Sequence, residues 1–304
     1  MRPFTAAAVQ FAPEPGPLTA ATVRANLDKA VAWTARCVTG SGAELVVLPE
    51  SCTTGFNPGI PAADLWGLVS AVPGPVTEPL QEAARDLGVH LCAGTYERGA
   101  APGTVHNAAV LIGPGGDVLG VYRKTHPFRV EDVRHGGWAT SGTGVRVVDT
   151  ELGRIGMAIC FDGDFPELWR IQAVRGAEIV CRPSALLRSA DIWELTCRAR
   201  AYDNHVYVVA ANAVGADPAG TLYFGNSMVV TPIAEVVARA ASHEDWAAAR
   251  LDPDAAMASL TPGSSVPHGF DHLAERNLAL YREHAADLLG EASTAFPHGQ
   301  RPHG

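Results

Sequence analysis

Short apolar runs of strand length alternate along the 304-residue chain with segments of helical periodicity. Residues 44–48 form one such run, which Pro49 ends, and a continuous apolar run is typical of a strand covered on both faces. Residues 18–38 instead repeat apolar side chains at the helical period of about 3.6 residues. Strands that alternate with helices indicate layers around a shared core, so the sequence predicts an α/β fold.

Two turn sequences predict hairpins within this alternation. Residues 113–117 (Gly-Pro-Gly-Gly-Asp) and residues 150–153 (Thr-Glu-Leu-Gly) each separate two apolar runs. Hairpins imply that the sheets are mixed rather than purely parallel. Further strands are expected at 6–11, 90–96, 107–112, 118–122, 145–149, 154–160, 178–181, 206–211, 227–231, 236–240 and 247–251, and further helices at 76–87, 166–176, 190–203 and 271–289.

The charge and the cysteine content indicate which partners are unfavourable and in which compartment the protein is expected. Lys and Arg number 23 against 32 Asp and Glu, a net charge of −9, and the basic residues are scattered, which disfavours nucleic acid and anionic membranes as partners. No apolar stretch approaches the roughly 20 residues of a membrane span, and the apolar segment near the N-terminus is too brief for a secretory signal. The six cysteines lack C-x-x-C spacing and indicate reduced thiols. We therefore expect a cytoplasmic protein.

The clearest candidate for a reactive side chain is Cys160. An apolar run ends at this residue, a short turn follows, and a helix is expected to begin near Pro166. A thiol there would face the positive end of the helix dipole, which lowers a thiol pKa, and backbone N–H groups that can receive an oxyanion. Two considerations oppose this interpretation: cysteine is among the most buried residue types, and Asp162 and Asp164 disfavour a thiolate unless they point away.

Two further reactive residues follow predicted strands. Glu50 comes directly after the apolar run at 44–48, and a carboxylate at the rim of a core has a raised pKa and can transfer protons. Lys124 ends another strand, where its ammonium can stabilise a developing negative charge. Taken alone, Glu50 is better explained as a solvated loop residue or a helix cap, and Lys124 as a solvated surface residue.

Taken together and in this order, these residues resemble the carbon–nitrogen hydrolase family, also called the nitrilase superfamily. The resemblance extends from the first strand to about Leu251 and rests on residues 48–50 (Leu-Pro-Glu), 123–126 (Arg-Lys-Thr-His), 159–162 (Ile-Cys-Phe-Asp) and 165–167 (Phe-Pro-Glu). These are similar to the family's general-base, lysine and nucleophile motifs. The family has a second active-site glutamate, for which Glu131 is the best match, with Asp132 and Glu151 as alternatives.

The resemblance implies an α-β-β-α sandwich in which Glu50, Lys124 and Cys160 converge. Cys160 would attack a carbonyl or nitrile carbon and form a thioester, and Lys124 with the backbone N–H of Phe161 would stabilise the oxyanion. Glu50 would transfer protons, Glu131 would position the substrate or align the lysine and carboxylate, and no metal or organic cofactor is needed. We expect the hydrolase domain to span residues 1–255. A C-terminal extension, 256–304, would contain a helix and a loose tail, and the protein would form a homodimer or larger homo-oligomer.

The residues around Cys160 bear on the substrate. True nitrilases usually carry Glu two residues after the cysteine, so Asp162 favours the amidase and N-carbamoyl-amine hydrolase branches and a small-molecule amide. Enzymes acting on N-carbamoyl D-amino acids tend to place arginines where this chain has Gly163 and Asp164, which disfavours that substrate class. N-carbamoyl amines and nitriles remain alternatives, as does a catalytically silent binding or scaffold protein on the same fold.

Four more residues are candidates for substrate contact. Asp164 either faces a cationic or hydrogen-bond-donating substrate or caps the following helix. Arg182, Arg188 and Trp193 follow the next predicted strand and either line the pocket or form structural ion pairs.

Overall fold

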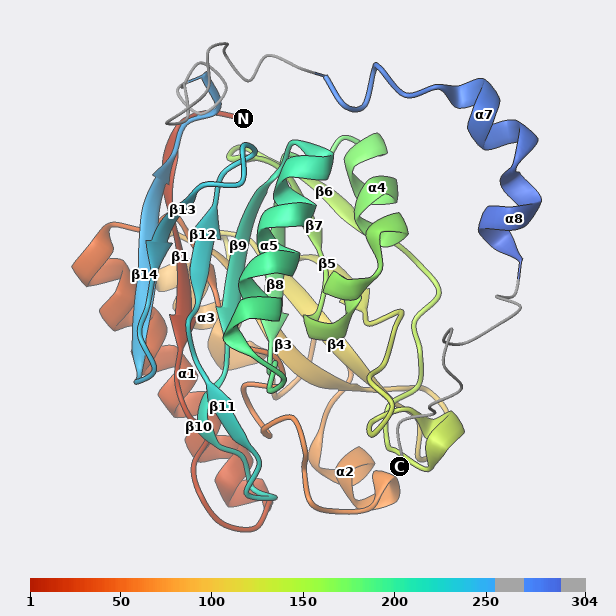
Figure 1. Ribbon diagram of the computed structural model, residues 1–304. Helices are drawn as coiled ribbons and strands as arrows, with labels where there is room; N and C mark the ends of the chain where they lie inside the picture. The colour runs from red at the N-terminus through yellow and green to blue at the C-terminus, as the bar shows by residue number, and fades with distance from the viewer. Residues whose placement is uncertain (255–270, 291–304) are drawn as a thin grey trace. The chain divides into compact units, whose positions relative to one another are not determined.

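Two six-stranded sheets lie face to face in the first part of the chain (Figure 1). The computed structural model describes residues 1–254 and 271–290, and the chain divides into the units Met1–Phe270 and Asp271–Gly304. The predicted domain boundary after residue 255 falls among the residues that are not described. It therefore stays a prediction.

The first sheet is mixed, as the predicted hairpins require. Its strands β1, β2 and β3 run parallel, while β14, β4 and β5 pair antiparallel with their neighbours. In spatial order the sheet contains β14 (Asp245–Leu251), β1 (Phe4–Gln10), β2 (Leu45–Val47), β3 (His90–Arg98), β4 (Val105–Ile112) and β5 (Val118–Arg123).

The second sheet repeats this arrangement. Its central strands β7, β8 and β9 are parallel, and antiparallel strands flank them on both sides. The order is β13 (Val236–Arg239), β12 (Met228–Val230), β9 (Tyr207–Asn212), β8 (Ile179–Ser184), β7 (Gly153–Met157) and β6 (Val147–Thr150). The two hairpins predicted from turn sequences, β4–β5 and β6–β7, are confirmed.

Helices cover the outer face of each sheet, which confirms the α-β-β-α sandwich. Against the first sheet pack α1 (Ala20–Ser41) and α3 (Glu78–Leu87). The second sheet is covered by α5 (Ala190–Asn204), with α4 (Pro166–Val174) beside it. Because side chains alternate across a strand, each sheet directs one set of apolar residues to its helices and the other set to the opposite sheet.

Local chemistry explains where these helices begin and end. Gly88 ends α3 in the left-handed conformation, with φ 67, and its N–H donates to backbone carbonyls of the last turn, as the sequence predicts. The hydroxyl of Ser189 accepts a hydrogen bond from the N–H of Ile192 and caps the start of α5.

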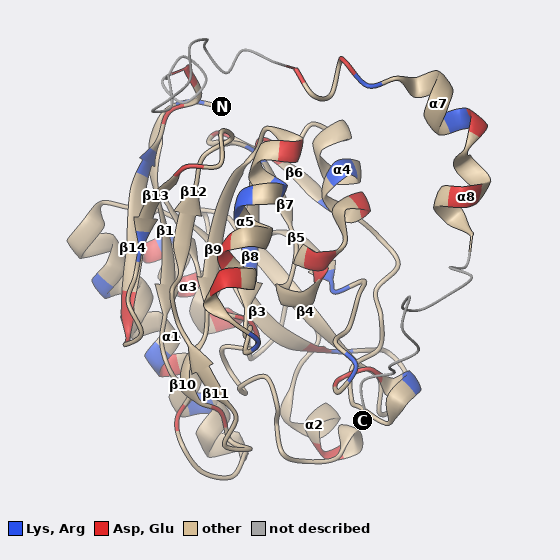
Figure 2. Ribbon diagram, in the orientation of Figure 1, with Lys and Arg blue, Asp and Glu red and all other residues tan. Residues whose placement is uncertain are grey.

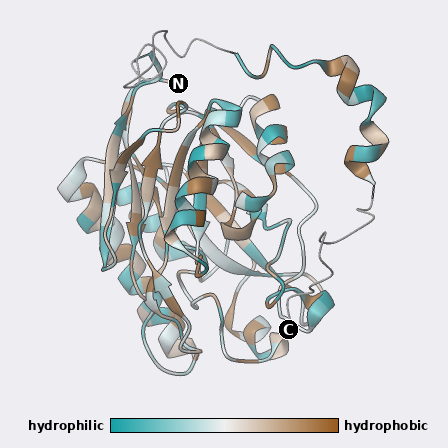
Figure 3. Cartoon of the chain, in the orientation of Figure 1, coloured by the Kyte–Doolittle hydropathy of each residue, from teal (hydrophilic) through white to brown (hydrophobic). Residues whose placement is uncertain are grey.

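Cysteine side chains mark the core between the sheets. Cys92 on β3 and Cys181 on β8 interact with one another, and both are fully buried. All six cysteines of the chain are buried thiols without a disulfide partner. Figure 3 shows the strands of both sheets mainly in apolar colours.

Several elements are absent from the sequence prediction. The short helix α2 (Ala62–Leu68), the 3-10 turn η1 (Val133–His135) and the hairpin of β10 (Val214–Ala216) and β11 (Leu222–Phe224) are each too short to produce a periodic pattern. In the second unit the predicted helix at 271–289 is instead two shorter helices, α7 (Leu278–Glu283) and α8 (Ala285–Leu289). The tail predicted to be loose lies almost wholly outside the described residues.

Charged residues of both signs are interspersed on the first unit (Figure 2). Among the described residues, no helix is both long and apolar enough to cross a membrane.

Candidate active site

Three loops that leave the two sheets carry the reactive residues to one place. Glu50 follows β2, Lys124 follows β5 directly, and Cys160 comes three residues after the end of β7. All three are buried. The Nζ atom of Lys124 lies 2.7 Å from Oε1 of Glu50, and the thiol of Cys160 interacts electrostatically with both charged groups. The structure therefore brings together the three residues that the sequence singles out.

The Glu50 carboxylate is held by three donors. Lys124 and the side-chain amide of Asn107 both donate to its Oε1, at 2.7 Å each. The backbone N–H of Ala185, from the second sheet, donates to Oε2 at 2.7 Å and also interacts with the Cys160 thiol. The carboxylate is thus held in place by groups from both sheets and interacts electrostatically with the Cys160 thiol.

Glu131 completes a closed ring of polar groups. Its carboxylate accepts hydrogen bonds from Lys124, from the amide of Asn107 at 2.8 Å and from the backbone N–H of Phe128 at 2.8 Å. Lys124 and Asn107 therefore each bridge the two glutamates. Removal of Lys124 or Asn107 would leave the two buried carboxylates with fewer hydrogen-bond donors to stabilise their negative charge.

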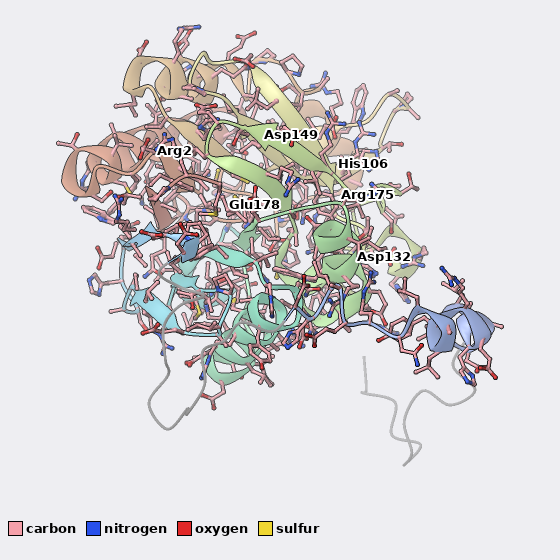
Figure 4. All side chains as sticks on the ribbon, turned by 90° about the horizontal axis from the view of Figure 1, so that it is seen from above. Arg2, His106, Asp132, Asp149, Arg175 and Glu178 are labelled. Carbon is pink, nitrogen blue, oxygen red and sulfur yellow. The ribbon has the colours of Figure 1, made fainter. Side chains whose placement is uncertain are left out.

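The other two acidic candidates lie elsewhere. Asp132, labelled in Figure 4, accepts hydrogen bonds from its neighbour Arg134, at 2.6 Å from Nη2. Glu151 is exposed and lies 3.5 Å from the ring of His90. Of the three residues, the structure brings Glu131 to the lysine.

Burial and charge set the protonation of this cluster. Burial lowers the pKa of Lys124, but the carboxylates of Glu131 and Glu50 outweigh this effect and hold that pKa well above its usual value. Burial raises the pKa of Glu131, and Glu50 adds to the rise while Lys124 opposes it. Burial and then the Glu50 carboxylate also raise the pKa of the Cys160 thiol, against Lys124 and Arg182. This upward shift means that the thiol needs a base to become a nucleophile.

The backbone of Cys160 adopts the left-handed conformation, with φ 44. The strand predicted to reach residue 160 ends at Met157, and Cys160 begins the 3-10 turn η2 (Cys160–Asp164) that leads to α4. A left-handed φ is uncommon for a residue with a side chain and recurs at functional sites. This sharp turn carries the thiol out of the line of the strand.

The carboxylate of Asp162 stabilises the 3-10 turn η2 through hydrogen bonds to groups other than the thiol. Its carboxylate accepts hydrogen bonds from the N–H of Ile159 at 2.9 Å, the hydroxyl of Tyr122 at 2.8 Å and the N–H of His126 at 3.1 Å. The carboxylate thus ties the nucleophile loop to the lysine loop. Sequence reasoning left open whether Asp162 opposes a thiolate; its bonding to these groups shows a structural use instead.

A small, mainly apolar cavity opens beside Cys160. The space at this opening, counted together with the solvent that it adjoins, is about 280 Å³, and the predicted residue Phe161 lies in its lining. The lining residues are Phe56, Phe128, Cys160, Phe161, Ala185, Leu186, Leu187 and Arg188. In the part of the chain that is described, no group of three or more His, Cys, Asp or Glu side chains has an arrangement suited to a metal ion.

Arg188 and Asp164 form an ion pair at this cavity. The two guanidinium Nη atoms lie 2.7 and 2.8 Å from the two carboxylate oxygens, and the guanidinium lies over the ring of Phe161. Asp164 provides no side-chain cap for α4, whose N-cap is Phe165. Arg188 thus satisfies both alternatives considered for it, because it lines the cavity and forms an ion pair.

Arg182 and Trp193 lie behind the nucleophile loop. Arg182 belongs to β8, which is longer than predicted, and donates to the carbonyl oxygen of Cys160. Trp193 is buried in α5, and its indole N–H donates to the carbonyl of Asn226 at 2.7 Å. Neither residue is part of the cavity lining, and their contact with substrate stays a prediction.

Sequence reasoning missed two groups that hold Glu50. Asn107 starts an otherwise apolar run, and this signal, a polar residue at a strand end, is the same one that identified Glu50. Ala185 acts through its backbone N–H, for which the residue type gives no signal.

Comparisons with known proteins show which proteins share this sequence and fold. The carbon–nitrogen hydrolase family model matches residues 5–258. The chain is 36% identical over 205 residues to a protein from Pyrococcus abyssi named nitrilase, which covers 67% of this chain and 74% of that protein. It is 33% identical over 226 residues to human omega-amidase NIT2, covering 72% of this chain and 80% of that protein. The solved carbon–nitrogen hydrolase of Helicobacter pylori G27 is 26% identical and superposes with a TM-score of 0.78, covering 95% of this chain and 99% of that chain.

Proposed function

Because the chain belongs to the carbon–nitrogen hydrolase family and is an enzyme of that type, we propose that it hydrolyses a small-molecule amide to an acid and ammonia through a thioester on Cys160. One observation carries the proposal: the buried ammonium of Lys124 bridges two carboxylates in the same cluster as the buried thiol of Cys160. Nucleophile, base and cation are thus available at one place.

In the first half of the reaction, the Glu50 carboxylate takes the proton of the Cys160 thiol. The sulfur then attacks the amide carbonyl carbon, and the carbonyl π electrons move to the oxygen. Lys124 and the backbone N–H of Phe161 stabilise this oxyanion. Glu131 holds Lys124 in position for that role.

In the second half, the oxyanion collapses and the carbon–nitrogen bond breaks. Glu50 returns its proton to the leaving nitrogen, so that ammonia departs and the acyl group remains on Cys160 as a thioester. Glu50 then takes a proton from a water molecule, whose oxygen attacks the thioester carbonyl. The carboxylic acid leaves and Cys160 recovers its proton from Glu50.

Asp162 favours an amide over a nitrile as the substrate. At the position where nitrilases usually carry Glu, this shorter acid is fully engaged in holding the nucleophile and lysine loops. The relatives' names do not choose between the two, since one is named nitrilase and the other omega-amidase. The small apolar cavity favours a compact acyl group, and the ion pair at Arg188 leaves little uncompensated charge for an ionic substrate.

An ammonia-release screen across primary amides, N-carbamoyl amines and nitriles tests the proposal. We expect turnover of at least one primary amide, loss of that turnover in Cys160→Ala, and retention in the matched buried variant Cys52→Ala. Release from nitriles alone would replace the amidase proposal with a nitrilase. Wild-type turnover in a folded Cys160→Ala would contradict the mechanism, and binding of amides without any turnover would favour a silent binding protein.

We also propose that the protein forms a homodimer or larger homo-oligomer through α4 and α5. These neighbouring helices expose apolar side chains, and Figure 3 shows apolar segments on both. The exposed residues are Ile171, Val174, Ile192, Leu195 and Tyr202. Sedimentation analysis should show an oligomer that Leu195→Glu dissociates and that the control Leu222→Glu, on β11, leaves intact. A wild-type monomer would contradict this proposal.

A cytoplasmic location is the third proposal. Its support is the set of six thiols, all buried and none joined in a disulfide. Cell fractionation should recover the native protein with the cytoplasm, and recovery with the periplasm or medium would contradict it.

A further inference from the structure

Arg182 is a buried arginine whose hydrogen bonds go to uncharged groups. Its Nη2 and Nε atoms donate to the carbonyl oxygen of Cys160, at 2.8 and 3.3 Å. Its Nη1 donates to the hydroxyl of Thr196 at 2.9 Å and approaches the sulfur of Cys197 at 3.1 Å, both on α5. The ring of Trp193 lies 4.7 Å from its Cζ atom. A buried guanidinium without a direct carboxylate partner is costly, so its position calls for a physical reason.

The alternation of side chains along β8 explains how Arg182 reaches the nucleophile loop. Cys181 faces the opposite sheet, where it meets Cys92, so the next side chain points toward the helix layer. From there the guanidinium fork binds the carbonyl of Cys160, the residue with φ 44. Two N–H groups on one rigid plane fix the orientation of that carbonyl and oppose relaxation of the turn.

The charge of Arg182 acts on the same buried cluster. With both carboxylates ionised, Glu50 and Glu131 exceed the single positive charge of Lys124 by one negative charge. Arg182 adds a positive charge beside Cys160, where it lowers the pKa of the thiol. When Cys160 gives its proton to Glu50, the negative charge moves toward Arg182 and the total stays unchanged.

Gly163 provides the space for this arrangement. A Cβ atom at this position would lie 1.9 Å from Nη2 and 2.2 Å from Cζ of Arg182. No side chain at residue 163 is therefore compatible with the guanidinium where it lies.

From these contacts we propose that Arg182 is a positioning residue for the nucleophile. It holds the carbonyl of Cys160 and thereby the reactive turn, and it supplies the positive charge that favours the thiolate, while Gly163 makes room for it. The inference rests on the proposed function in one respect, the assignment of Cys160 as nucleophile.

The test combines turnover of the best amide with the pH dependence of Cys160 alkylation by iodoacetamide. In Arg182→Leu we expect kcat to fall at least about tenfold, KM to change little because Arg182 does not line the cavity, and the alkylation profile to move up by about one pH unit. Arg182→Lys should have the wild-type alkylation profile but a reduced kcat. An ammonium keeps the positive charge, but it cannot donate two hydrogen bonds from one rigid plane to the Cys160 carbonyl. The control Arg154→Leu, a half-exposed arginine on β7, should match wild type in both measurements.

Gly163→Ala provides a second, independent test. It should reduce kcat in the wild-type background, because the new methyl group displaces the guanidinium. In the Arg182→Leu background the same alanine should cost less than about twofold, so that the two changes are not additive. Full additivity would contradict the proposed role of Gly163.

A folded Arg182→Leu with wild-type kcat and alkylation profile overturns the proposal. If that variant does not fold, Arg182→Lys tests the proposal instead. Wild-type kcat in a folded lysine variant would show that the paired hydrogen bonds to the Cys160 carbonyl are unimportant, and would overturn the proposal. Failure of the proposed function gives a different result: no amide is hydrolysed by wild type, while the alkylation profile still depends on Arg182.

Discussion

The two sheets hold their reactive groups in different ways. Glu50 and Lys124 follow strands of the first sheet, and hydrogen bonds between side chains hold both of them in place. Cys160 leaves the second sheet, and there the backbone is held, through the carbonyl bound by Arg182. Charge pairing thus fixes the base and the cation, whereas chain geometry fixes the nucleophile. Loss of a partner should cost stability on the first side and orientation on the second.

The largest effect is expected from Lys124→Met. This variant leaves Glu50 and Glu131 buried without their shared cation, so it should lose turnover and about 3–5 kcal/mol of unfolding free energy at neutral pH. Lys29 is the only other lysine of the chain. It pairs at the surface with Glu14 and Glu244, so Lys29→Met should cost no more than about 1 kcal/mol. Urea denaturation of both variants measures the difference.

The pH dependence of the same measurement sharpens this contrast. A carboxyl group whose pKa is raised by folding binds its proton more tightly in the folded state, so its unfavourable contribution grows as the pH rises above the unfolded value. The pKa of Glu131 is already raised, and loss of Lys124 removes an opposing effect. The stability deficit of Lys124→Met should therefore shrink as the pH falls toward 4.5. A deficit that grows on acidification would contradict the buried-cluster description.

A smaller effect is expected from Asn107→Ala. The change removes one bridge between the two glutamates while Lys124 remains, so kcat should fall about 10- to 100-fold. Asn204 is a matched control: it is also buried, its amide donates to a backbone carbonyl, and its Oδ1 likewise lacks a partner. Asn204→Ala should cost a similar amount of stability, about 1–3 kcal/mol, without loss of kcat. Equal kcat in the two variants would show that Asn107 has only a packing role.

The smallest effect is expected outside the site, from Glu194→Gln. Hydrogen bonding by Arg239 holds the pKa of Glu194 below its usual range, so this pair stabilises the fold above the unfolded value near 4.5 and loses its effect as the pH falls through the lower folded value. The carboxylate is partly exposed, so the loss should be about 0.5 kcal/mol at pH 7. Thermal denaturation at pH 7 and at pH 3 should show the difference only at the higher pH. If Glu194→Gln lost as much unfolding free energy as Lys124→Met, surface and buried ion pairs would contribute equally to stability, which would contradict the comparison.

Much of the fold was accessible from the sequence because long elements carry strong periodicity. Most of the strands, the long helices and the two hairpins follow from apolar runs and turn residues such as those at 113–117, whereas the two-sheet sandwich followed from the family resemblance. The short strand β10 interrupts its apolar residues with glycine and leaves no such signal, whereas the equally short β2 lies within the apolar run at 44–48. The break between α7 and α8 lies at His284, where neither glycine nor proline marks it.

The candidate site was accessible where a polar residue interrupts an apolar run. Glu50, Lys124 and Cys160 all stand at such points, and their motifs carry the family resemblance. Contacts made by backbone atoms were not accessible: the N–H of Ala185 and the carbonyl of Cys160 depend on how the two sheets meet. Substrate contact was one of two roles considered for Arg182, because the predicted strand ended at residue 181, three residues before Ser184, and the direction of the side chain was unknown.

The central claim is that Cys160 forms a covalent acyl intermediate. Mass spectrometry of the intact protein and its peptides, after incubation with a slowly hydrolysed amide, tests it most directly. We predict one added acyl mass, on Cys160, which disappears in Cys160→Ala. Cys52 is the relevant comparison, because it lies two residues from Glu50 and burial raises the pKa of its thiol to about 12. An acyl adduct on Cys52, or turnover of the amide with no adduct on Cys160 at any time, would contradict the claim.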